Sequence, residues 1–276
     1  MAAGDEIVSV RCGPGVETRQ EFFCEAVWDG EFDSGNFDQT DIVAGSGGRL
    51  RDGRLTFVSS GSMQDRLHFQ TVDKTSYVSN SLSALTAATD AGIDPTRDDY
   101  PEIFGTIYGG LDEYERKFPT SKGAVNFLYY ENVGWDGQDL TIVQKPRIRR
   151  DFSSYARYTN FLETTMAAVV ANAGDPQRRI QFDPLVTLSS GYDGPAVAAI
   201  ASTAGVRRGI TLAVDRDGVD DSGEEIGNIL GYEMTVFGRE SWQALKMPEI
   251  DGIAASGNAA EVSFADMQEH LENGLL

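Results

Sequence analysis

The strongest constraint on the fold is an apolar run that passes directly into a Ser/Gly-rich loop and then into small residues, LVTLSSGYDGPAVAAIAST at 185–203. The run predicts a buried strand, and Pro195 suits the first turn of a helix. Strands are predicted at 184–188, 209–214 and 232–237, and helices at 153–171, 195–203, 224–230 and 263–272. Alternating strands and helices are typical of a parallel sheet, so the second half is expected to be an α/β domain.

The first half has a different pattern. Short β-branched or aromatic runs predict strands at 6–12, 22–28, 54–59, 67–72, 76–79, 124–131 and 140–143. A short helix is expected after Asn80, and the glycines at 45–48 are expected to form a turn. These features favour an antiparallel α+β domain. The charged segment KPRIRRD, 145–151, marks the boundary between two domains, 1–148 and 149–276.

The charge of the chain is strongly negative. Lys and Arg total 23 against 43 Asp and Glu, which gives a formal net charge of −20. Such a surface repels phosphate backbones and anionic lipid headgroups, so we expect no nucleic-acid partner and no membrane partner. The excess of acid and the 18 Arg beside 5 Lys suit a halophile, but an ordinary acidic protein from a GC-rich genome fits equally well.

The first residues of the chain bear on its location in the cell, and its two cysteines bear on its thiol chemistry. The opening MAAGDEIVSV has acids and no apolar core, so it does not resemble a signal peptide, and a cytoplasmic location is expected. Cys12 and Cys24 lack metal-ligand spacing and are interpreted as free thiols in the core. His68 and His270 are expected to be structural or exposed, and the acidic run 215–221 to be a solvated turn.

The loop after the strand at 184–188 is the candidate binding site. Its small residues allow backbone N–H groups to approach an anion, and the helix that follows adds a partial positive charge. Asp193 would either contact a metal-bound polyphosphate or cap the helix. The competing interpretation, of equal weight, is a strand–helix turn without a ligand. The candidate residues are Ser189, Ser190, Gly191, Tyr192, Asp193 and Gly194.

This loop resembles the pyrophosphate loop, Ser-Gly-Gly-x-Asp-Ser, of the ATP pyrophosphatases, and most closely that of the asparagine synthetase C-terminal domain. Ser189, Gly191 and Asp193 match, whereas Ser190 replaces a Gly and Gly194 replaces the last Ser. The segment 209–237 is similar to the second strand and helix of that domain. The segment 75–93 is loosely similar to part of the glutaminase-like N-terminal domain of the same family.

The resemblance implies a Rossmann-like parallel sheet of the ATP pyrophosphatase type that binds ATP and Mg²⁺. It places Val214 and Asp215 near the adenine and Asp193 near the metal. Such enzymes adenylate a small carboxylate, release pyrophosphate, and transfer the acyl group to ammonia or an amine. Because Gly194 stands where the family pattern has a Ser, the chain lacks the hydroxyl that contacts the pyrophosphate in that pattern. No catalytic residue, acyl substrate or oligomeric state is indicated.

Three functions are therefore weighed. The first is an ATP-dependent, asparagine-synthetase-like ligase, and the second is a nucleotide-binding or scaffold protein that has lost catalysis. The third is a class II amidotransferase, which needs an N-terminal Cys as nucleophile. Because Ala2 follows Met1, no glutaminase activity is expected. We also expect the chain to be the N-terminal portion of a longer protein, incomplete at its C-terminus, with NGLL at 273–276 entering a third parallel strand.

Overall fold

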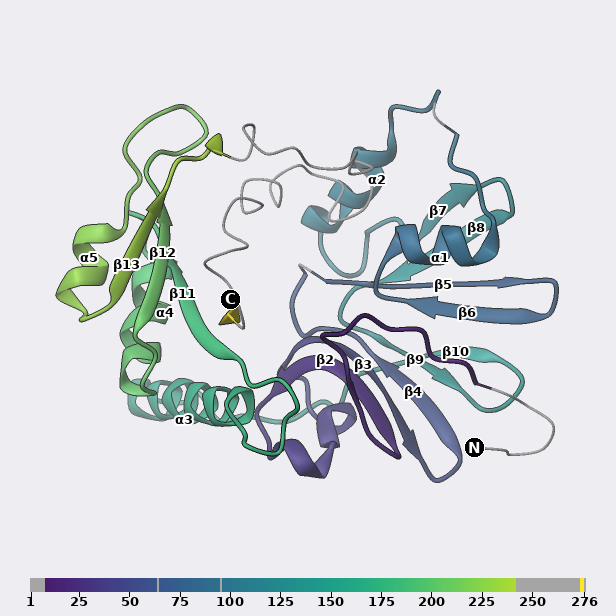
Figure 1. Cartoon of the computed structure of the whole chain (residues 1–276), viewed down its shortest axis with the longest axis horizontal. Helices are drawn as coiled ribbons and strands as arrows, with labels where there is room; N and C mark the ends of the chain where they lie inside the picture. The colour runs from purple at the N-terminus through teal and green to yellow at the C-terminus, as the bar shows by residue number, and fades with distance from the viewer. Residues whose placement is uncertain (1–7, 64, 95, 242–273, 276) are drawn as a thin grey trace. The chain divides into compact units, whose positions relative to one another are not determined.

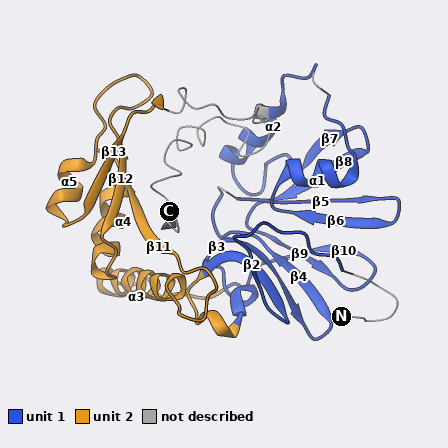
Figure 2. Cartoon of the chain, viewed as in Figure 1, with its two compact units in different colours: residues 1–27, 35–147, 248–261 blue, residues 28–34, 148–247, 262–276 orange. Residues whose placement is uncertain are grey.

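The structure is a computed structural model that describes residues 8–63, 65–94, 96–241 and 274–275 (Figure 1). The chain divides into two compact units (Figure 2). Unit 1 contains the described residues of 8–27 and 35–147, and unit 2 contains 28–34, 148–241 and 274–275. None of the helices in these described ranges is both long enough and apolar enough to cross a membrane.

Unit 1 contains two antiparallel sheets. The strands of the first, in spatial order, are β1 (Glu17–Thr18), β2 (Phe22–Trp28), β3 (Val43–Arg51), β4 (Arg54–Val58), β9 (Asn132–Trp135) and β10 (Leu140–Val143). Those of the second are β6 (Thr75–Ser79), β5 (Leu67–Val72), β8 (Gly123–Leu128) and β7 (Lys117–Thr120). The helical segments are α1 (Leu82–Thr89), α2 (Tyr100–Gly105) and the 3₁₀ turns η2 (Asn36–Gln39) and η3 (Thr106–Gly109).

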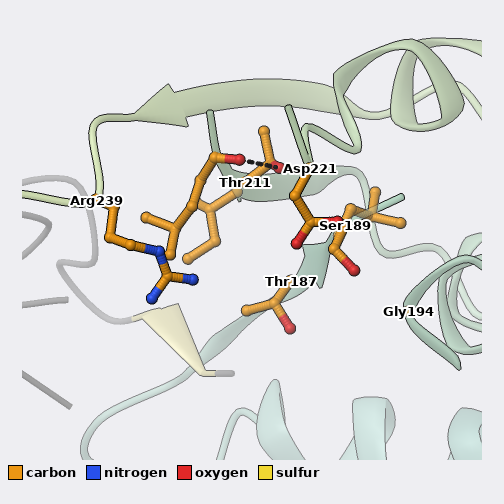
Figure 3. A pocket seen from close by; sticks show the side chains of 9 residues that line it. Thr187, Ser189, Gly194, Thr211, Asp221 and Arg239 are labelled. Atoms are coloured by element: carbon orange, nitrogen blue, oxygen red, sulfur yellow. Dashed lines mark hydrogen bonds between the residues drawn. The ribbon is translucent and has the colours of Figure 1, made fainter. Parts of the chain in front are cut away.

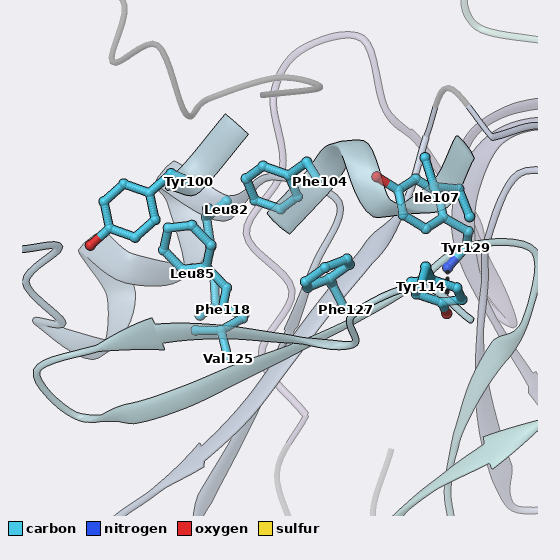
Figure 4. Close-up of a cluster of buried hydrophobic side chains, with 10 residues drawn as sticks. All are labelled: Leu82, Leu85, Tyr100, Phe104, Ile107, Tyr114, Phe118, Val125, Phe127 and Tyr129. Atoms are coloured by element: carbon cyan, nitrogen blue, oxygen red, sulfur yellow. Dashed lines mark hydrogen bonds between the residues drawn. The ribbon is translucent and has the colours of Figure 1, made fainter. Parts of the chain in front are cut away.

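An aromatic core joins α1 and α2 to the second sheet (Figure 4). The ring of Phe118 stacks on Tyr100 and Phe104, with centroids 4.6 and 5.3 Å away. Leu82 and Leu85, one turn apart on α1, are also fully buried. Ser81 begins α1, because its side chain accepts a hydrogen bond from the Ala84 N–H. This arrangement confirms the helix that was expected after Asn80.

The glycines at 45–48 lie inside β3, so the expectation of a turn there was wrong. A β-carbon on Gly45 would lie 2.1 Å from the Glu25 carbonyl oxygen, and one on Gly47 would lie 2.5 Å from that of Phe23. The glycines therefore allow β2 and β3 to approach each other closely. A glycine cluster that serves close backbone approach has the same composition as a turn, which is why the sequence pattern was misleading.

Unit 2 contains a small sheet of four parallel strands. Their spatial order is β13 (Glu233–Phe237), β12 (Arg208–Leu212), β11 (Asp183–Leu188) and β14 (Gly274–Leu275). The α-helices of this unit are α3 (Tyr155–Ala173), α4 (Asp193–Thr203) and α5 (Glu224–Ile229), and η1 (Phe32–Ser34) is a 3₁₀ turn. Val186 and Leu188 pack in one cluster with Ala198 and Ala201 of α4, whereas Leu185 packs in another with Ile210 and Phe237. The alternation along β11 therefore gives the sheet two apolar faces.

Most of the predicted elements are present, but several boundaries move. Residues 8–12 of the expected strand at 6–12 form no strand, and residues 6–7 lie outside the described part. No strand was predicted at β1, β3, β7 or β9, and no helix at α2. In the described residues the parallel sheet has four strands: the three predicted at 184–188, 209–214 and 232–237, and β14. The NGLL segment does supply a parallel strand, β14, beside β11. The expected helix at 263–272, including His270, lies outside the described residues.

The mixed α and β character is confirmed: antiparallel sheets in one unit and a small parallel sheet in the other. The cysteine interpretation was half wrong. Cys24 is fully buried in β2, but Cys12 is exposed. Cys12 lies in the segment before β1, which forms no helix or strand at this residue.

Candidate anion-binding site

The candidate site lies at the carboxyl edge of the parallel sheet. β11 leads into Ser189 and Ser190, β12 leads into a loop that carries Asp221, and Arg239 follows β13. Because parallel strands all end at the same edge, the residues that follow them meet there. They surround a pocket of about 270 Å³ (Figure 3), whose polar and glycine lining is Thr187, Ser189, Gly194, Thr211, Asp221 and Arg239.

Two donors of one loop residue, Ser190, converge on a carboxylate. The Ser190 hydroxyl donates to Oδ1 of Asp221 at 2.6 Å, and the Ser190 N–H lies 3.1 Å from the same oxygen. The Ser190 N–H also lies 3.1 Å from the main-chain oxygen of Asp221. The Gly191 N–H donates to the Ser189 hydroxyl at 3.2 Å. Both donors of Ser190 therefore meet one carboxylate oxygen of Asp221, whereas the Gly191 N–H is used within the loop.

Helix α4 begins within the predicted loop. Asp193 is its first residue, and Tyr192 is the N-cap residue without a side-chain capping bond. The capping role proposed for Asp193 is therefore not observed. Tyr192 is 94% exposed and Asp193 is exposed, and neither lines the pocket. Of the six predicted loop residues, Ser189 and Gly194 line the pocket directly, and Ser190 reaches it through Asp221.

Two glycines set how closely the loops approach β11. A β-carbon on Gly223 would lie 2.5 Å from Leu188 Cβ, which is closer than real side chains come. The Gly223 N–H donates to the Thr211 hydroxyl at 2.9 Å, which ties the loop after β12 to its own strand. A β-carbon on Gly194 would lie 3.3 Å from the Thr187 carbonyl oxygen, so that position has little spare room.

Val214 and Asp215 do not line the pocket. The expected strand at 209–214 ends at Leu212, because Val214 forms an isolated antiparallel bridge with Asp220. The Asp215 carboxylate accepts hydrogen bonds from the N–H groups of Asp217 and Val219, at 2.8 and 2.9 Å. Both residues therefore belong to a turn, as the acidic composition of 215–221 predicted. Leu212, the last residue of β12, lines the pocket.

Sequence reasoning missed Arg239 and Asp221. Arg239 is half-buried, and its Nε donates to the Val214 carbonyl oxygen at 3.1 Å. Within the described residues, its two terminal guanidinium nitrogens have no hydrogen-bond acceptor, and the side chain lines the pocket. The sequence did contain one indication of the role of Arg239, because this basic residue stands two places after the end of a predicted strand. Nothing in the sequence distinguished Asp221 from the other aspartates of the run 215–221.

The described residues at this edge of the sheet do not form a metal site made of protein ligands alone. Across the part of the chain that the structure describes, no group of three or more His, Cys, Asp or Glu side chains is arranged to hold a metal ion. Mg²⁺ commonly binds through one or two carboxylates together with substrate phosphates and water. Asp193 could act only as a ligand of this kind.

Unit 1 holds buried polar groups of a structural kind. His68 on β5 is 2% exposed, and its Nε2 accepts a hydrogen bond from Arg66 Nε at 3.2 Å. Burial and the positive charge of Arg66 lower the pKa of His68 to about 3. This histidine is therefore neutral at physiological pH and serves as an acceptor for a buried guanidinium, in agreement with the structural role predicted for it.

Comparisons with family models and with curated proteins were negative. No protein-family model matches the chain, and no curated protein matches it. The functional argument therefore depends on the geometry of the pocket and on the sequence resemblance described above.

Proposed function

We propose that this chain binds the phosphates of Mg–ATP at the loop 189–194 and is an ATP-dependent amide-forming ligase of the asparagine synthetase-like type. The observation that carries the proposal is the pair of Ser190 donors that converge on one anionic oxygen, Asp221 Oδ1. A carboxylate oxygen is chemically close to a phosphate oxygen, so the same donors suit a phosphate. The proposal includes a Rossmann-like, ATP pyrophosphatase-type assignment for unit 2 and a cytoplasmic location.

The charges around the pocket support an anionic ligand. Arg239 supplies a cation whose terminal nitrogens have no acceptor among the described residues. The N-terminus of the 11-residue helix α4 adds a partial positive charge beside Gly194. Asp193, in the first turn of that helix, is the proposed Mg²⁺ ligand. When bound, Mg²⁺ would neutralise charge on the phosphates during attack by the acyl substrate.

The size of the pocket limits which part of ATP it can hold. Ligand pockets usually measure about 300–1,000 Å³, and this one measures about 270 Å³. It suits the phosphate chain, and the adenosine would extend outward. Val214 and Asp215, in the neighbouring turn, are the proposed contacts for the adenine. A small carboxylate and an ammonia or amine donor are the proposed co-substrates.

The second candidate is a nucleotide-binding or scaffold protein without catalysis. Two features favour it: Gly194 lacks the hydroxyl of the family pattern, and Asp193 does not line the pocket. ATP–pyrophosphate exchange in the presence of candidate carboxylates separates the two candidates. The ligase incorporates labelled pyrophosphate into ATP, and the scaffold binds ATP without exchange.

Calorimetric titration with Mg–ATP tests the phosphate site itself. Arg239→Met should weaken binding about tenfold, because a hydrogen bond to a charged group contributes about 1.5–3 kcal/mol. Arg149→Met is the matched control, since Arg149 is an exposed arginine of the same unit that neither lines the pocket nor belongs to the turn proposed to contact the adenine. Equal affinity of the wild type and both variants would exclude phosphate binding at this edge.

A further inference from the structure

We propose that Asp221 is an internal competitor of the phosphate: its carboxylate occupies the donors of Ser190 until a magnesium-bound polyphosphate displaces it. This inference rests on the proposed function and adds a selectivity device to the same site. It follows from an arrangement that a simple phosphate loop does not need, namely a carboxylate 2.6 Å from the Ser190 hydroxyl oxygen.

The backbone around Asp221 is fixed independently of its side chain. The Asp221 N–H lies 3.4 Å from the Ala213 carbonyl oxygen, and Ser222 forms an antiparallel bridge with Ser189. The next residue, Gly223, is tied to Thr211. The carboxylate can therefore leave by rotation of the side chain, while the loop after β12 keeps its place.

Displacement of the Asp221 carboxylate breaks few hydrogen bonds. The Ser190 N–H is shared between the carboxylate and the main-chain oxygen of Asp221, each at 3.1 Å. When the carboxylate rotates away, the N–H retains an acceptor, and only the Ser190 hydroxyl loses its partner. An incoming phosphate oxygen restores that bond.

Electrostatics then decides which anions can enter. A phosphate that approached Ser190 while the carboxylate remained would place two negative groups within a few ångströms of each other, which is strongly unfavourable. A polyphosphate gains Arg239 in the same pocket and carries Mg²⁺, which can accept the released carboxylate. Inorganic phosphate offers fewer such contacts. Asp221 is therefore expected to exclude small anions and to make binding depend on Mg²⁺.

Asp220 provides a matched control. It is exposed and adjacent, and its carboxylate accepts a hydrogen bond from the Ser222 N–H at 3.0 Å rather than from the loop. Replacement of either aspartate removes one negative charge from the same turn. Only replacement of Asp221 frees the Ser190 hydroxyl.

The experiment is calorimetric titration of inorganic pyrophosphate, with and without Mg²⁺, into wild type, Asp221→Ala, Asp221→Asn and Asp220→Ala. Asp221→Ala should bind pyrophosphate about tenfold more tightly without Mg²⁺, since a competing charged hydrogen bond is removed. Asp221→Asn should show a smaller gain, and Asp220→Ala should stay within about twofold of the wild type.

Three other outcomes are decisive. Unchanged or weaker binding by Asp221→Ala, with the wild type binding normally, overturns the inference and leaves the proposed function standing. No binding of pyrophosphate or Mg–ATP by any protein overturns both. If Asp221→Ala does not fold, the Ser190 amide resonance of the wild type decides: a shift on addition of Mg–pyrophosphate supports displacement, and no shift at saturation contradicts it.

Discussion

Lys145 donates a hydrogen bond from Nζ to the main-chain oxygen of Ser59 at 2.6 Å, although only 4% of the Lys145 surface is exposed. Its second acceptor is Oδ1 of Asn132, at 3.1 Å. Oδ1 of Asn132 also accepts from the Ser59 N–H, so the three residues join β4, β9 and the segment after β10. Burial lowers the pKa of Lys145 to about 8, and the attraction of Asp41 only partly offsets this.

The first prediction is that unit 1 gains stability as the pH rises from about 8 to about 10.5. The folded chain releases the Lys145 proton near pH 8 and the unfolded chain near 10.5, so the unfolded state binds more protons in this window. The gain is at most about 3 kcal/mol. Urea unfolding at pH 7.5, 9 and 10 should show the rise in wild type and in the exposed control Lys122→Met. A rise of the same size in Lys145→Met would contradict it.

The second prediction concerns acid. The folded pKa of His68 is about 3 and its ordinary value is 6.5, so folding resists protonation of this histidine. The contribution is intact above pH 6.5 and falls as the pH drops toward 3, with a loss of about 2 kcal/mol between pH 6.5 and 5. His68→Gln keeps a hydrogen-bond acceptor for Arg66 but has no group that titrates. The stability of this variant should therefore depend less on pH between 6.5 and 5 than that of the wild type. Identical acid dependence of the two proteins, measured by chemical unfolding, would exclude this role.

The third prediction separates two glycines near the pocket. Gly223→Ala should destabilise the protein by about 1–3 kcal/mol, because its β-carbon would lie 2.5 Å from Leu188 Cβ and 2.7 Å from the Leu188 carbonyl carbon. At Gly191 the one atom of the described residues near the new β-carbon is the Ser189 hydroxyl oxygen at 3.3 Å, so Gly191→Ala should change the stability little. Thermal unfolding of both variants checks this. Equal melting temperatures would show that the loop after β12 can move away from β11.

The fourth prediction is that Gly194→Ser tightens Mg–ATP binding about ten- to a hundredfold, through one added charge-assisted hydrogen bond. Gly194 lies in the first turn of α4, outside the left-handed region of backbone conformation, so a serine is sterically possible there. The Thr187 carbonyl oxygen, 3.3 Å from the new β-carbon, must shift slightly. Gly194→Ala is the control for that shift. Tightening by alanine as well as serine would show that the hydroxyl is not responsible.

The fifth prediction is that the chain releases no ammonia from glutamine. Cys12 is exposed, but it follows Arg11 in the chain, so its nitrogen belongs to a peptide bond and cannot serve as the α-amino base that the reaction needs. A coupled ammonia assay checks this. Glutaminase activity that disappears in Cys12→Ala would overturn the prediction.

Local patterns were good guides wherever a single periodicity governed the segment. β2, β5 and β10 begin and end at the predicted residues, because alternating apolar and β-branched residues specify a half-buried strand. α3 was predicted at 153–171 and spans Tyr155–Ala173, because the Ser154 side chain caps its start by accepting a hydrogen bond from the Arg157 N–H. The glycines of β3 were misinterpreted, since their role depends on the backbone of a strand about 20 residues earlier.

By itself, the sequence determined that a strand, a small-residue loop and a helix follow one another at 184–203, since these depend on residues within one or two turns of the chain. Only the tertiary structure placed Asp221 against Ser190, 31 residues away, and brought Arg239 to the same pocket. It also removed Val214 and Asp215 from that pocket by folding them into a turn. Parallel strands align their carboxyl ends through hydrogen bonds between distant segments, and no local pattern records which residues of the three loops then meet.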